Sequence, residues 1–191
     1  MYLSPADLSG VTNVCPMAEM AGCKKGCLNT AGRGVMSPVQ KGRLRKTLYF
    51  INDYENFMNE LVKDILSVIS KAKKIDCKPM VRLNGTSDIL WERKGFTLQE
   101  KYAKRLGVEA KYYKNLMELF PDVQFYDYTK ISGRFNKNLP KNYDLTFSCS
   151  GVDSYKKQVD FALKKGARIA VVLEMKTIQK NLWDYLLLME R

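Results

Sequence analysis

The sequence predicts an α/β fold built on a mainly parallel sheet with crossover helices. Short apolar stretches that end in polar turns recur along the chain, and helical segments with recognisable caps separate them. The composition, 46% hydrophobic and 27% charged, is that of a globular domain. Alternation of strands and helices gives a parallel sheet with right-handed crossovers, which is either open or curved into part of a barrel.

Two helices are expected before the first strand. Residues 37–40 (SPVQ) combine a capping hydroxyl, a proline suited to the first helical turn and a glutamine three residues after the cap. They predict a helix that runs to about Tyr49. Asp53 caps a second helix, in which apolar residues from Phe57 to Ala72 recur at spacings of three and four and form one apolar face.

The remaining elements alternate between buried strands and helices. Strands are predicted at Pro79–Gly85, Asp122–Lys130, Tyr143–Gly151 and Ala167–Glu174. Helices are predicted at Glu100–Leu106, at Ala110–Leu119, and from Asp153 or Ser154 to Gly166. We expect residues 1–173 to form a single α/β domain that carries an N-terminal cysteine loop at residues 13–34. Residues 174–191 form a divergent tail.

The chain carries no sign of export or membrane insertion. No apolar run approaches the roughly 20 residues that cross a bilayer, and no signal peptide precedes the domain. We therefore expect a cytoplasmic protein that does not contact a membrane. Five cysteines in a reducing compartment are expected to be free, metal-binding or catalytic.

Three of these cysteines share one short loop. Cys15, Cys23 and Cys27 have the spacing C-x7-C-x3-C, and a glycine directly precedes each of the last two. Three soft thiolates favour an iron–sulfur cluster or zinc over hard cations. Because the chain has no histidine, zinc would need Cys77 or Cys149 as a fourth ligand, and Cys149 is the better placed of the two. The alternative is a loop of unligated thiols.

A cluster held by three cysteines leaves one iron open. Radical S-adenosylmethionine enzymes use a [4Fe–4S] cluster in this way and place its loop after the first strand of a partial barrel. Their usual spacing is C-x3-C-x2-C, so the similarity lies in the architecture, and S-adenosylmethionine is the cofactor that it implies.

Polar residues follow successive predicted strands. Loops at the carboxyl ends of parallel strands converge, and ligands usually bind there. From this rule we expect catalytic roles for Asp88, Asp127 and Lys130, and substrate contacts from Asn84, Thr86, Tyr128 and Arg33. Lys130 and Arg33 would hold anionic groups, and either aspartate would accept a hydrogen bond or a proton. Taken singly, each of these residues is also a common turn former.

The charge restricts the partners and the chemistry. A formal charge of +12 favours an anionic small molecule or nucleic acid, and the absence of histidine excludes Ser-His-Asp and Cys-His catalysis. The densest basic cluster, Lys41, Arg43, Arg45 and Lys46, lies on the helix that starts near Pro38. A zinc-stabilised protein that contacts nucleic-acid phosphates through this helix is therefore an alternative.

A nuclease is a third possibility. Glu174-Met175-Lys176 directly follows an apolar strand and matches the E-x-K element of restriction-like nucleases, in which carboxylates hold a divalent ion.

Three long segments carry a family resemblance. They are YLSPADLSGVTNVCPMAEMAGCKKGCLNTAGRG, VRLNGTSDILWE and FPDVQFYDYTKISGR. These segments resemble blocks of the bacteriophage "gene product 88" family over roughly residues 2–173. The resemblance implies a phage-associated protein in the cytoplasm of a bacterial host and supplies no reaction. The matching positions are Cys15, Cys23, Cys27, Arg33, Asn84, Thr86, Asp88, Trp91, Glu92, Asp127, Tyr128 and Lys130. The tail after Val172 departs from the family pattern, which we interpret as the product of a frameshifted or truncated gene.

Overall fold

The computed structural model describes residues 1–136 and 138–172. Its central feature is a four-stranded parallel sheet in the order β1-β4-β5-β6, formed by β1 (Met80–Val81), β4 (Gln124–Thr129), β5 (Tyr143–Ser148) and β6 (Ile169–Ala170). The predicted α/β class with a mainly parallel sheet is confirmed. Among the described strands, no pairing joins β6 to β1, so the sheet is open and is not a closed barrel.

One face of this sheet lies in the core, and the described residues leave the side chains of the other face partly exposed. Phe125, Asp127 and Thr129 of β4 are buried, and they share a face with the buried residues of β5 because Phe125 pairs with Tyr143. Successive strand side chains point to opposite faces. The intervening residues therefore face away from the core, and Tyr128 among them is 42% exposed.

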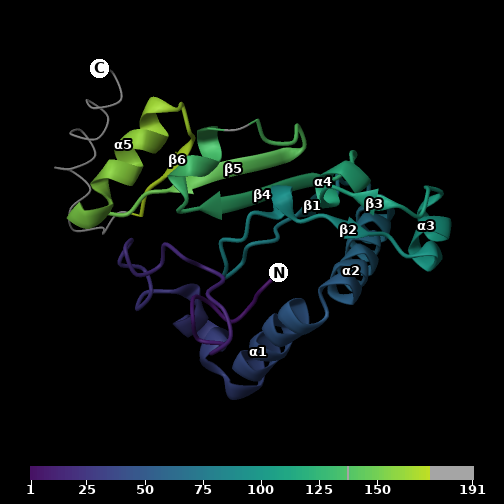
Figure 1. Ribbon diagram of the computed structural model, residues 1–191, viewed down its shortest axis with the longest axis horizontal. Coiled ribbons are helices and arrows are strands. Elements are labelled where there is room, and N and C mark those ends of the chain that lie inside the picture. The colour runs from purple at the N-terminus through teal and green to yellow at the C-terminus, as the bar shows by residue number, and fades with distance from the viewer. Residues whose placement is uncertain (137, 173–191) are drawn as a thin grey trace.

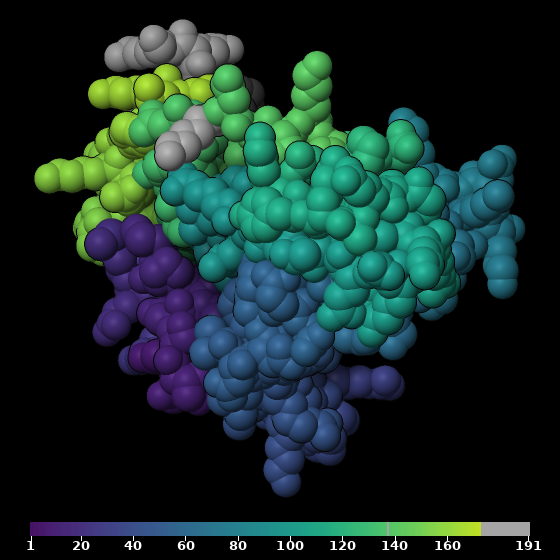
Figure 2. Space-filling model, turned by 45° about the vertical axis from the view of Figure 1, so that its right-hand side comes forward, coloured from purple at the N-terminus to yellow at the C-terminus, as the bar shows by residue number. Residues whose placement is uncertain are grey.

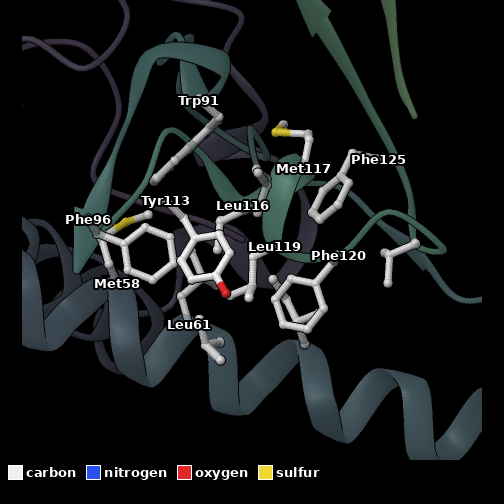
Figure 3. Packing of buried hydrophobic residues seen from close by; sticks show 14 of the residues in the cluster. Met58, Leu61, Trp91, Phe96, Tyr113, Leu116, Met117, Leu119, Phe120 and Phe125 are labelled. Carbon is white, nitrogen blue, oxygen red and sulfur yellow. The ribbon is translucent and has the colours of Figure 1, made fainter. Parts of the chain in front are cut away.

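One of the two long helices, α2 (Tyr54–Lys74), packs on the buried face beside β1, and α1 (Ser37–Asn52) packs against α2. Both helices form where they are predicted. The predicted caps are not used: the residue before α1 is Met36, and the Asp53 side chain makes no capping hydrogen bond to α2. Met58, Leu61 and Ile65 of α2 are almost fully buried in the same cluster as Phe125 of β4. Figure 3 shows Met58 and Leu61 projecting from the helix towards Phe96, Tyr113 and Leu119. The apolar periodicity of α2 therefore forms the main core.

The carboxyl half of the sheet packs against a second, smaller cluster. Helix α5 (Lys156–Lys164) follows β5, and the rings of Phe147 and Tyr155 stack with centroids 6.0 Å apart. Gly166, with φ +69°, ends the helix as its position in the sequence predicts. Below this cluster lies the N-terminal loop, which is purple in Figure 1.

The segment between β1 and β4 departs from the prediction in part. Helix α3 (Glu100–Leu106) forms as expected, but Ala110–Leu119 is not one helix. Instead, β3 (Tyr112–Tyr113) pairs antiparallel with β2 (Phe96–Thr97), and only α4 (Leu116–Leu119) is helical. The Asn115 side chain accepts a hydrogen bond from the Glu118 amide at 2.9 Å and caps α4, which starts six residues later than predicted.

The remaining helical segments are short 3-10 turns. They are η1 (Leu28–Thr30), η2 (Gly32–Val35), η3 (Trp91–Arg93), η4 (Ser132–Asn136) and η5 (Asp153–Tyr155). Within the described part of the chain, no helix has both the length and the apolar character needed to span a membrane.

Candidate functional site

The cysteine loop is attached to the carboxyl edge of the sheet. The Ser150 hydroxyl, just after β5, donates to the Ala21 carbonyl at 2.6 Å, and the Asp88 amide donates to the Val14 carbonyl at 2.8 Å. Figure 2 shows the purple N-terminal loop in contact with the yellow-green α5 region. The predicted position of this loop, beside the strand ends where ligands bind, agrees with these contacts.

Glycine is needed where the loop meets the sheet. Gly22 has φ +65°, and a Cβ atom added there would lie 3.0 Å from Cγ1 of Val152. The next amide, that of Cys23, donates to the Ala18 carbonyl at 3.0 Å. Gly22 therefore permits both the tight turn and the close approach that bring Cys23 to the strand ends.

The three loop thiols lie close enough to interact electrostatically. Burial raises the pKa of Cys15 to about 12, and negative charge on Asp88, Cys23 and Cys27 raises it in the same direction. Burial also raises the pKa of Cys23, with a further contribution from Cys27. Lys130 opposes both shifts. The other two predicted ligands, together with Lys130 and Asp88, thus lie near enough to affect the pKa of Cys15.

The thiols do not surround a single ion as they stand. In residues 1–136 and 138–172, no three cysteine or carboxylate side chains converge on one position that fits a metal ion. Zinc binds sulfur at about 2.3 Å, so two of its sulfur ligands lie at most about 4.6 Å apart. In an iron–sulfur cluster each thiolate binds a different iron, and the sulfurs are further apart. As they lie, the thiols of the described residues therefore assign neither metal to the loop.

The other two cysteines differ in their relation to the loop. Cys149 is buried at the end of β5 in the same apolar cluster as Cys23. Both thiols contribute, after burial and Asp88, to the raised pKa of Tyr155. Cys77 is exposed beyond the end of α2, where its thiol donates to the Ile75 carbonyl. Cys149 thus belongs to the site and Cys77 does not.

Asp88 is part of a buried ionic network that the sequence did not reveal. The guanidinium of Arg134, whose side chain is fully buried, contacts Asp88 Oδ1 at 3.2 Å and Glu92 Oε2 at 2.7 Å. Asp88 also accepts hydrogen bonds from the Thr129 hydroxyl and the Lys130 amide, each at 2.7 Å. Burial raises the pKa of Asp88, whereas these donors and Arg134 lower it. The carboxylate therefore holds the loop before η3 against the end of β4.

Asp127 extends the same network. It accepts hydrogen bonds from the Asn84 amide at 2.7 Å and from the Tyr143 hydroxyl at 2.9 Å, and that hydroxyl also accepts one from Arg134 at 3.0 Å. Burial raises the pKa of Asp127 to about 6, although these donors lower it. No local sequence signal marks Arg134 or Tyr143, because their roles depend on partners far away in the chain.

Two predicted substrate contacts are used inside the protein. The Asn84 side-chain oxygen accepts hydrogen bonds from Ser87, from the Ile89 amide and from the Trp91 indole, while its amide donates to the Ile89 carbonyl. The Thr86 hydroxyl donates to the Leu3 carbonyl. These two side chains shape the turn after β1.

The other three predicted residues lie apart from one another. The Lys130 ammonium donates to the Ser148 carbonyl at 2.9 Å and lies beside the thiols. Tyr128 is on the open sheet face, with the Arg82 guanidinium 4.9 Å from its ring centroid. Arg33 is exposed in η2. The predicted pocket is therefore divided between a buried network, an open sheet face and the loop edge.

The basic helix differs from expectation at one position. Arg43 is only 8% exposed, and its guanidinium donates to the side-chain and backbone oxygens of Asn29 and lies 5.4 Å from the Tyr2 ring centroid. The expected phosphate contact by Arg43 is therefore wrong, whereas Lys41 and Arg45 line a shallow surface hollow. Glu174 and Lys176 of the nuclease hypothesis lie outside the described residues.

Comparison with known proteins places the chain in a family. No curated protein and no solved structure matches it. The family model described as "Gene product 88" matches residues 1–190, which include the cysteine loop and the strand-end residues of the site. The chain therefore belongs to the gene product 88 family.

Proposed function

We propose that the protein binds an iron–sulfur cluster through Cys15, Cys23 and Cys27 in the cytoplasm of a bacterial host. The observation that carries this proposal is the placement of three half-buried thiols within electrostatic reach of one another at the carboxyl edge of a parallel sheet. Thiolates gathered in this way repel one another, and a bound metal centre offsets that repulsion because it replaces their protons. The raised pKa of Cys15 argues against a reactive free thiolate.

The surroundings support a cluster with three protein ligands. Lys130 provides positive charge beside the thiols, and Asp88 ties the end of β4 to the loop that carries Cys15. When bound, such a cluster supplies one electron to a molecule at the iron that lacks a protein ligand. S-adenosylmethionine is the cofactor proposed for that position, and the enzyme would then be radical-SAM-like.

The sheet supports the same proposal. In the described chain, α2 and α5 both pack on the face that carries Asp127 and Phe147, and the opposite face stays open. Helices on one face only are the arrangement of a partial barrel, in which the other face lines the interior. Tyr128 and Arg82 on this open face are the side chains that we assign to an anionic substrate.

Metal analysis of protein purified without oxygen tests the proposal. We expect iron with acid-labile sulfide at about four of each per chain and broad visible absorbance. The Cys149→Ala variant should keep the iron, because the proposed cluster uses only the loop cysteines. Zinc at about one per chain that is lost in Cys149→Ala would contradict the cluster. If the cluster is present, cleavage of S-adenosylmethionine under reducing conditions tests the enzymatic part.

A zinc-stabilised nucleic-acid-binding protein is the second candidate. The formal charge of +12 and the surface cations Lys41 and Arg45 on α1 favour it. Binding to DNA or RNA should then weaken steeply with salt, and Arg45→Gln should reduce the slope of that dependence by about one. A salt-independent or absent interaction would rule this candidate out.

A further inference from the structure

A second candidate site borders the start of the cysteine loop and shares Asp88 with the buried network. An open hollow of about 380 Å³ lies between residues 12–16 and residues 88–94. Phe50, Ile89 and Leu90 contribute apolar lining, and Val14 and Pro16 border it on either side of Cys15. Its volume is at the lower end of the range for sites that bind small organic molecules.

The charge around this hollow is one-sided. Arg93 and Lys94 line it, and neither forms an ion pair with a carboxylate in the described part of the chain. The Lys94 ammonium lies 5.8 Å from the ring centroid of Phe50. Asp88 is the one carboxylate among the described lining residues, and Arg134 already pairs with it. The hollow therefore combines an apolar lining with two cations, Arg93 and Lys94, that form no ion pair among the described residues.

We propose that this hollow binds a small organic anion. An aromatic or aliphatic body would contact Phe50 and Ile89, while a carboxylate or phosphate group would pair with Lys94 and Arg93. The burial of apolar surface and the pairing of two available cations favour the same class of ligand. This inference does not depend on a metal at the cysteines, because none of its contacts involves a thiol.

An NMR titration with matched probes tests this assignment. We would add indole-3-acetate, its neutral analogue indole-3-acetamide and 1-naphthyl phosphate to ¹⁵N-labelled protein. Both anions should shift the amide signals of residues 12–16 and 88–94, and the amide analogue should bind roughly tenfold more weakly. Tighter binding of indole-3-acetate would indicate a carboxylate site, and tighter binding of 1-naphthyl phosphate would indicate a phosphate site.

Charge-neutralising variants locate the contact. Lys94→Gln and Arg93→Gln should each weaken anion binding roughly tenfold and leave binding of the neutral amide unchanged. Lys104→Gln, on the exposed surface of α3, is the matched control and should bind like the unaltered protein. Equal affinity for indole-3-acetate and indole-3-acetamide would overturn the proposal. It would also be overturned if the shifts were confined to other residues, or if no signal shifted up to about 10 mM of either anion. Circular dichroism establishes that each variant is folded.

Discussion

Arg134 shows how a single buried cation can hold two parts of the chain together. Its side chain is fully buried between Asp88 and Glu92, and it also donates to Tyr143. Removing one partner from a buried ion pair is costly because the other charge is left without compensation in a medium of low dielectric constant. At this position, two carboxylates would be left unpaired.

We therefore predict that Arg134→Met lowers the free energy of unfolding by about 3–5 kcal/mol, measured by urea denaturation. Arg168→Met is the matched control, because Arg168 forms a 2.8 Å ion pair with Asp144 but its side chain is 67% exposed. Exposed pairs contribute at most about 1 kcal/mol. Similar losses in the two variants would show that the buried network does not stabilise the fold as described.

Asp127 gives a prediction about pH. Its folded-state pKa of about 6 lies above the ordinary value of 3.8, so the unfolded chain ionises first as the pH rises. As the pH rises from about 4 to about 6, the free energy of unfolding should therefore fall by up to about 3 kcal/mol because of this group. Asp127→Asn removes the ionisation, so the difference in stability between this variant and the unaltered protein should change over that window.

Urea denaturation at pH 4 and pH 7 measures this difference. Asp144→Asn serves as the control, because Asp144 is partly exposed and pairs with Arg168 at the surface. If the difference between the unaltered protein and Asp127→Asn is the same at both pH values, the raised pKa of Asp127 is refuted.

At the scale of elements, the turn after β1 depends on a close backbone approach. A Cβ atom at Gly85 would lie 2.3 Å from the Met1 carbonyl oxygen, which accepts a hydrogen bond from the Gly85 amide at 2.7 Å. The turn also carries Asn84 and Thr86, whose side chains fix its shape. A side chain at residue 85 would push the N-terminal segment away from the sheet.

Gly85→Ala should therefore destabilise the protein by about 2 kcal/mol or more. Gly42→Ala, in the middle of α1 with open space around it, is the opposite case and should stabilise by roughly 0.5–1 kcal/mol. Thermal unfolding of the two variants should give shifts in melting temperature of opposite sign. Shifts of the same sign would contradict the described packing at residue 85.

The elements differ in how far the sequence determines them. Helices α1, α2, α3 and α5 form where apolar periodicity, Pro38 and terminal glycines predict them, and these are local signals. The pairing of β2 with β3 is not local, and it replaces the first half of the helix predicted at residues 110–119 because Tyr113 is buried in the main core. Edges of elements and short strands depend on such contacts.

The candidate site could be predicted only in part. The sequence placed Cys15, Cys23 and Cys27 in one loop at the carboxyl edge of the sheet, and the structure brings them together with Lys130. From the sequence alone, a polar residue that binds a ligand could not be distinguished from one that stabilises a turn. Asn84 is of the second kind. That distinction depends on hydrogen-bond partners distant in sequence.

At the scale of the whole molecule, three features converge on one edge of the sheet. The loop thiols lie at the carboxyl ends of β4 and β5, the buried Asp88 network supports that edge, and an apolar hollow with two cations lies beside the loop. This edge is where we propose a metal-dependent site in this member of the gene product 88 family.

The most direct test is the iron content of single cysteine variants prepared without oxygen. Cys15→Ala, Cys23→Ala and Cys27→Ala should each lose the cluster, whereas Cys77→Ala should keep about four irons per chain because its thiol is exposed and lies outside the site. Iron that persists in the three loop variants, or is missing from the unaltered protein, would contradict a cluster held by this loop.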